Sequence, residues 1–128
     1  MTMESDLAQL IPVVESHIVG GWFTENLVTN PGVGDLAADT GELNAGKYDA
    51  HIWVYNGNAG GTVFLFQHRN AANDANVREQ VTYFTTLLFK EMVWLKNYPV
   101  GEGERLRIII NTAFAGNCQG SIFGTRRI

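Results

Sequence analysis

The chain has 128 residues and a formal net charge of −4, with 45% hydrophobic and only 17% charged residues. This length predicts one domain over residues 1–128, large enough to bury a core without disulfides or a metal. The nine Lys and Arg residues are scattered apart from Arg126 and Arg127, which argues against a nucleic-acid partner. No apolar run approaches the roughly 20 residues of a membrane span, so no membrane partner is expected.

Residues 1–15 are expected to form a short N-terminal helix or an arm. Asp6 is placed to cap a helix, with Gln9 three residues later as a capping box requires, while Pro12 limits how far a straight helix can run. The apolar residues fall on one helical face: Leu7, Leu10, Ile11 and Val14. Acidic residues precede these apolar ones, unlike a secretory signal, so synthesis and folding in the cytoplasm are expected.

A β-hairpin is predicted from the strongest pattern in the chain, over residues 47–68. Apolar and polar or aromatic residues alternate from Tyr48 to Tyr55, and a period of two sends alternate side chains to opposite faces of a strand. The turn-type residues of 56–61 follow, and the β-branched and aromatic residues of 62–68 predict the second strand.

Residues 76–98 fit two interpretations. Apolar residues spaced by three and four from Val77 to Leu95 fit a helix. The abundance of Thr, Val, Tyr, Phe and Trp, together with the alternation around Val81 to Phe89, favours strands. Since the rest of the chain has β character, strands are the preferred prediction and a helix stays open.

The C-terminal part, residues 105–128, adds a β-branched run, a turn at 115–120 and a last strand. This brings the count to roughly seven or eight short strands at turn-punctuated spacing, which is typical of an antiparallel sandwich or barrel.

One stretch, FQHRNAANDANVREQ at 66–80, resembles a reactive cluster because it gathers charged and imidazole side chains: His68, Arg69, Asp74, Arg78 and Glu79. Its Asn and Asp residues are, however, the types whose side chains bond their own backbone in turns. We therefore interpret the stretch as a connection between strands.

No catalytic, cofactor or metal site is predicted. The segment Gly32–Ala37 matches a dinucleotide fingerprint but lacks the preceding strand and following helix that the fingerprint needs. The histidines at 17, 51 and 68 share no ligand spacing, Glu102 and Glu104 are expected to be solvated turn charges, and Cys118 is expected to be a small core residue. A small enzyme remains the weakest of three functional hypotheses.

One face of the strand at 47–55 is a candidate binding surface, because it carries His51, Trp53 and Tyr55. Protein interfaces are enriched in Trp, Tyr and Arg, and exposed aromatic rings can also stack on sugars. The same side chains could instead be half-buried against a loop or a second sheet.

Residues 64–77 and 100–128 together resemble the small single-jelly-roll cement, or decoration, proteins of tailed bacteriophages. The resemblance rests on a strand that runs into the Asn/Ala-rich turn of His68–Asp74, on Gly103-Glu104-Arg105 with Arg107, and on the closing strand at Gly120–Arg127. It covers roughly residues 46–128 and rests on strand and turn rhythm.

The resemblance implies an all-β, antiparallel jelly-roll β-sandwich on the capsid surface of a virion. Its partners would be the major capsid protein and itself, as a homodimer or homotrimer, with no cofactor. Aromatic and arginine placement suggests these interface residues: His51, Trp53, Tyr55, Arg69, Arg126 and Arg127. The alternative is a binding module of the same fold, TNF-like or tail-fibre-like, that recognises a carbohydrate or a receptor.

Overall fold

The computed structural model describes residues 18–127, with side chains from Thr24 onward, and every regular element in this part of the chain is a β-strand. The strands are β2 (Ile18–Thr29), β3 (Leu36–Asp39), β4 (Gly46–Asn56), β5 (Thr62–Arg69), β6 (Val81–Thr85), β7 (Phe89–Val100), β8 (Arg105–Ile110) and β9 (Asn117–Arg127). The all-β prediction is confirmed. The helix or arm expected over 1–15 lies outside the described residues. In 18–127 there is no helix that is long and apolar enough to cross a membrane.

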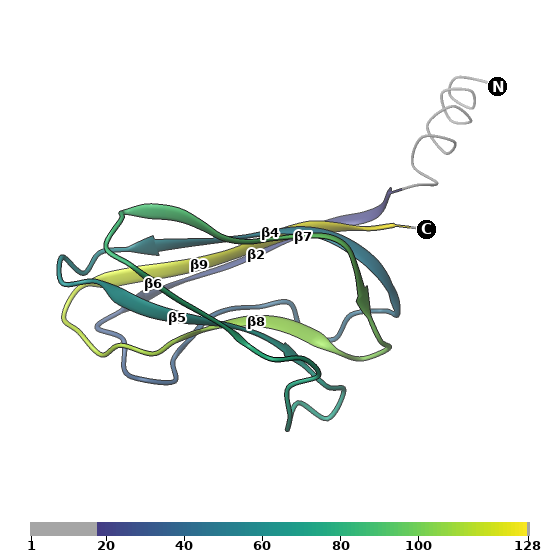
Figure 1. Ribbon diagram of the computed structural model, residues 1–128, viewed down its shortest axis with the longest axis horizontal. Coiled ribbons are helices and arrows are strands. Elements are labelled where there is room, and N and C mark those ends of the chain that lie inside the picture. The colour runs from purple at the N-terminus through teal and green to yellow at the C-terminus, as the bar shows by residue number, and fades with distance from the viewer. Residues whose placement is uncertain (1–17, 128) are drawn as a thin grey trace, which may run out of the picture.

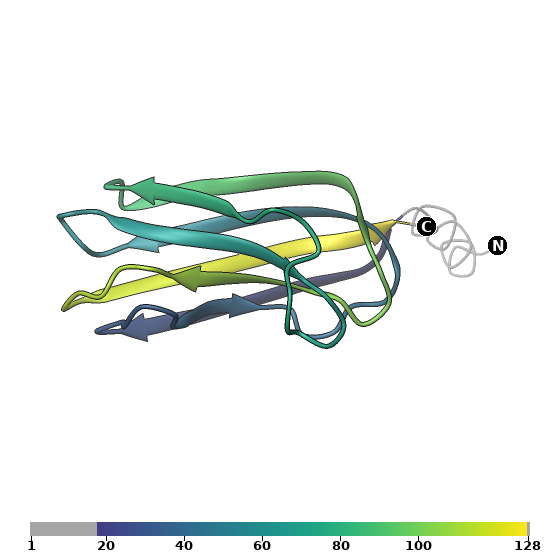
Figure 2. The same cartoon turned by 60° about the horizontal axis from the view of Figure 1, so that its bottom comes forward.

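The strands form two four-stranded sheets, in the orders β2-β9-β4-β7 and β3-β8-β5-β6, which lie face to face as two layers (Figures 1 and 2). The first strand pairs with the last and the pairing continues inward, as β2–β9, β3–β8, β4–β7 and β5–β6, all antiparallel. The chain is thus one long antiparallel hairpin, rolled up so that β4 also pairs with β9 and β5 with β8. This topology is the jelly roll, so the predicted β-sandwich is confirmed.

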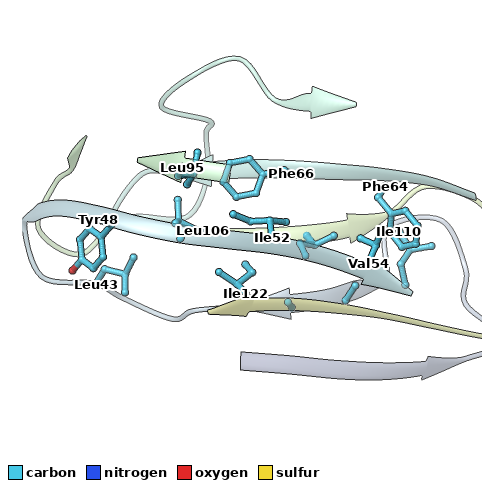
Figure 3. Packing of buried hydrophobic residues seen from close by; sticks show 14 of the residues in the cluster. Leu43, Tyr48, Ile52, Val54, Phe64, Phe66, Leu95, Leu106, Ile110 and Ile122 are labelled. Carbon is cyan, nitrogen blue, oxygen red and sulfur yellow. The ribbon is translucent and has the colours of Figure 1, made fainter. Parts of the chain in front are cut away.

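The core lies between the sheets and follows from the period of two. In β4 the even-numbered residues from Tyr48 to Val54 are buried, whereas the odd-numbered ones from Asp49 to Tyr55 face outward. Phe64 and Ile110 meet them from the second sheet and are fully buried (Figure 3). The other labelled members of the cluster are Leu43, Phe66, Leu95, Leu106 and Ile122.

The ambiguous segment at 76–98 is strand, not helix, because it contains β6 and most of β7. These two strands belong to different sheets, and Figure 1 shows the chain crossing from one layer to the other between them. The helical spacing of the apolar residues was misleading, since the chain changes sheets at 86–88 and the inward positions change with it.

Candidate functional site

An exposed aromatic surface covers the outward side of the sheet β2-β9-β4-β7. We call it the aromatic face and define it by six side chains: His51, Trp53 and Tyr55 on β4, Phe89 and Trp94 on β7, and Phe123 on β9. Trp94 is 62% exposed and Phe89 is 65% exposed. Large exposed apolar patches on a soluble domain mark interaction sites. The structure therefore brings the predicted residues of β4 together with three aromatic rings that the sequence had not indicated.

His51 lies at the centre of the aromatic face, opposite Trp94 on one neighbouring strand and Phe123 on the other. Its ring stacks on that of Trp94, with centroids 5.7 Å apart and an interplanar angle of 9°, and on that of Phe123 at 5.5 Å. Its Nδ1 lies 2.5 Å from Oε2 of Glu91. These contacts hold the rings in place before any partner arrives, which lowers the entropy cost of binding.

Two β-bulges in β7 decide which of its side chains reach the aromatic face. The pairing of β7 with β4 shifts by one residue at two places along β4, between Tyr48 and Ala50 and again between Ile52 and Trp53. At the first shift Asn97 takes a left-handed φ of 55° and its N–H donates to Oδ1 of Asp49 at 2.8 Å. Each extra residue reverses the alternation of side chains. This is why simple alternation along 89–100 could not have placed Trp94 on the outside.

Asp49 joins three strands at this bulge, since its Oδ2 also accepts a hydrogen bond from Nε of Arg127 at 2.7 Å. The Asn97 N–H, followed by Arg127, lowers the pKa of the Asp49 carboxyl below its ordinary value. A carboxylate whose pKa is lower in the folded than in the unfolded state contributes stability above the unfolded pKa, about 3.9. That contribution is lost as the pH falls through the folded pKa.

We therefore expect the free energy of unfolding of the wild type to fall more steeply than that of Asp49→Asn as the pH is lowered from about 5 to about 2. Urea unfolding at stepped pH, followed by circular dichroism, measures both curves. Parallel curves would show that Asp49 does not stabilise the bulge electrostatically.

The apolar surface continues from the aromatic face to the connection between β6 and β7. Tyr55 and Phe89 are ring neighbours at 5.1 Å, and beyond them Leu87 and Leu88 are more than half exposed. Phe84, also more than half exposed, lies across Gly61, where a Cβ would come 2.4 Å from its ring. This end of the sandwich thus presents several large apolar side chains that are more than half exposed.

A basic hollow lies at the opposite end of the same sheet, lined by Gly46, Lys47, Asn97, Arg126 and Arg127. Arg126 lies across Gly46, and its Nε donates to the carbonyl of Ala45 at 3.1 Å. Lys47 and Arg127 are register partners and share the outward side of the sheet with His51. Of the predicted interface arginines, Arg127 therefore borders the aromatic face, whereas Arg126 alternates to the other side of β9, as the register partner of the buried Tyr48.

Arg69, the third predicted arginine, lies in the other sheet at the end of β5. Its guanidinium donates to the side chain and carbonyl of Asn73 and to the side chain of Asn76. It thereby holds its own loop together and lies apart from the aromatic face.

Residues 70–80 connect β5 to β6, as predicted, but residues 66–69 still belong to β5, so His68 is a strand residue and not part of the turn. His68 is 3% exposed, and its Nδ1 and Nε2 lie 2.8 Å from the Tyr98 hydroxyl and 2.7 Å from Glu104 Oε1. A carboxylate only accepts, so Nε2 donates to Glu104, while Nδ1 shares a hydrogen bond with the Tyr98 hydroxyl. This network ties β5 to β7 in the opposite sheet.

Glu104 is therefore not the solvated turn charge that its loop position suggested. Its Oε1 also accepts from the Gly101 N–H at 2.6 Å, and this bond, followed by that of His68, lowers the pKa of the carboxyl. Burial raises the pKa of Tyr98, and Arg78 lies 4.9 Å above its ring. Both ring nitrogens of His68, the Tyr98 hydroxyl and Glu104 Oε1 have partners, as a structural network requires.

No group of three or more His, Cys, Asp or Glu side chains in 18–127 is arranged to hold a metal ion. His17 lies outside the described residues. Gly32–Ala37 runs through a turn directly into β3, so it presents no helix N-terminus to a phosphate.

Cys118 is fully buried on the inward side of β9, and burial raises the pKa of its thiol to about 11. Only about one thiol in a thousand is then ionised at pH 8. We expect no reaction with a thiol-specific dye in the native protein and one equivalent of reaction in urea. Prompt labelling of the native protein would contradict the assignment of Cys118 to the core.

Comparison with known sequences does not identify a family for this chain. No protein-family model matches the chain, and the search of curated proteins finds no match either.

Proposed function

We propose that this protein is a structural protein of a virion, a capsid cement or decoration protein whose aromatic face binds the major capsid protein. The observation that carries the proposal is the aromatic face itself: exposed, pre-oriented rings on the outward side of the sheet β2-β9-β4-β7. A surface of this kind is suited to binding another protein, since interface cores are enriched in aromatic residues. The step from protein partner to capsid is supported by the resemblance of residues 46–128 to cement proteins.

The charge distribution supports binding through this face. Its centre contains one ion-pairing contact, His51 with Glu91, and its other defining side chains are aromatic. Charged residues lie at its border, where Lys47 and Arg127 flank the basic hollow. An apolar centre with a charged rim is the usual anatomy of a protein interface.

Trp94→Ala tests the proposal. Truncating a central interface Trp commonly costs 2 kcal/mol or more, so we expect binding to shells assembled from the major capsid protein to weaken by about 30-fold or more. Cosedimentation measures binding, and the melting temperature of the shells reports stabilisation. The matched control is Val33→Ala, because Val33 is 66% exposed in the turn before β3, which belongs to the other sheet.

Wild-type protein that neither sediments with the shells nor raises their melting temperature would overturn the proposal. Equal binding by the wild type and Trp94→Ala would show that the aromatic face is not the surface that binds the shells.

A carbohydrate-binding module is the second candidate function. It is favoured by the nearly parallel His51 and Trp94 rings, because flat exposed rings stack well on sugars. Glycan-array binding that is lost in Trp94→Ala, together with no binding to shells, would select this function over the first.

A further inference from the structure

The aromatic face and the basic hollow are continuous, and together they define the chemistry of a ligand. Phe123 lies four residues along β9 from Arg127, about 13 Å at about 3.3 Å per residue. A ligand that covers both must be apolar where it meets the rings and acidic where it meets the hollow. The acids next to the hollow are already engaged: Asp49 binds Arg127, and Glu102 accepts the amide N–H of Ala45. Lys47 has no acidic partner among the described residues.

The first 17 residues of the chain have this composition. They contain three acidic residues, Glu4, Asp6 and Glu15, and no Lys or Arg. Six apolar residues stand between the second and third of these acids: Leu7, Ala8, Leu10, Ile11, Val13 and Val14. The segment therefore matches the surface in both charge and apolar character.

The segment also joins the sandwich at the right place. β2 begins at Ile18, which is the register partner of Arg127, and Figure 1 shows the start of β2 beside the end of β9. Glu15 is three residues from this point, within reach of Lys47 and Arg127. Val14 to Leu10 would follow, and five extended residues span about 17 Å, enough to pass from the hollow over His51 and Phe123.

We propose that residues 1–17 dock on the aromatic face of their own chain, with Glu15 at the basic hollow and Leu10–Val14 over the rings. Covalent attachment gives such a short segment an effective concentration in the millimolar range, so modest contacts suffice to hold it. A partner that binds the same face must displace the segment. Docking itself does not depend on whether that partner is a capsid.

A spin label on the segment tests the proposal in the full-length chain. The label is placed at Ala8→Cys, since Cys118 is buried and does not compete for it. We expect the backbone amide signals of β4, β7 and β9 around His51, and the indole N–H signal of Trp94, to lose most of their intensity. The control label is placed at Ala72→Cys, an exposed residue in the connection between β5 and β6 of the other sheet, and should leave these signals unchanged.

A charge exchange tests the position of Glu15. Lys47→Glu alone should restore much of the lost signal, and adding Glu15→Lys should bring the loss back. Failure of the double variant to do so would overturn the pairing.

Unattenuated signals with the Ala8 label would overturn docking. Equal attenuation in isotope-labelled chains that carry no spin label, when they are mixed with spin-labelled chains, would overturn docking within one chain. Shell binding is not measured in any of these experiments, so their outcome is separate from that of the proposed function.

Discussion

Phe64→Ala is expected to lower the free energy of unfolding by about 3–5 kcal/mol, the largest effect of any substitution considered. Phe64 is fully buried on β5, between Tyr83 of β6 and Ile110 of β8 in the register. Removing the ring loses its transfer free energy and leaves a cavity that two hydrogen-bonded sheets cannot collapse to fill. A domain of this size has only about 5–15 kcal/mol in total, so the variant should be close to unfolding at 37 °C.

The control for Phe64→Ala is Phe89→Ala, because Phe89 is 65% exposed on the aromatic face. Its loss is expected to cost less than about 1 kcal/mol. Urea unfolding followed by circular dichroism gives both values, and an unchanged slope with denaturant would show that the unfolded states are comparable. Similar costs for the two variants would contradict the assignment of the core.

His68→Leu is expected to be the second most damaging change, at about 2–3 kcal/mol. Leucine fills much of the imidazole's space, so the cost comes mainly from lost hydrogen bonds. The Tyr98 hydroxyl loses its partner beside the core, and Glu104 keeps only the Gly101 N–H of its two bonds. A buried polar group left without a partner costs more than the bond itself contributed.

The chain offers a matched control in His51→Leu, since His51 also contacts a glutamate but has a side chain that is 42% exposed. Water can solvate Glu91 after the change, so we expect a cost of less than about 1 kcal/mol. Combining His68→Leu with Tyr98→Phe should cost less than the sum of the two, because both break the same bond. Strict additivity would show that the two side chains are not coupled.

Much of the fold could be predicted from the sequence, for a definite physical reason. Along β4 one side of the strand is buried and the other is open, so buried and outward-facing residues alternate strictly. This alternation was enough to assign each residue of 47–55 to the inward or the outward side. The connection at 70–80 was recognisable because Asn70 and Asp74 bond their own loop. The jelly-roll topology itself came only from the resemblance, because strand order depends on contacts far apart in the sequence.

The candidate site could be predicted only in part. His51, Trp53 and Tyr55 were found because they lie on the regular strand. Trp94 was missed because the bulges of β7 reverse its alternation, and no local signal besides Asn97 marks the shift. Arg69 was misplaced because an exposed arginine and one that holds a loop look alike in sequence.

The pairing of β2 with β9 has a consequence for biosynthesis. An inner hairpin such as β5–β6 can close while the chain is still being made, but β2 finds its partner only when Asn117–Arg127 has left the ribosome. Contacts between such distant segments make folding slow. In the finished sheet β9 lies between β2 and β4. Until β9 is made, both of these strands have an unpaired edge. Chains of this protein should therefore be most prone to aggregate before β9 has left the ribosome.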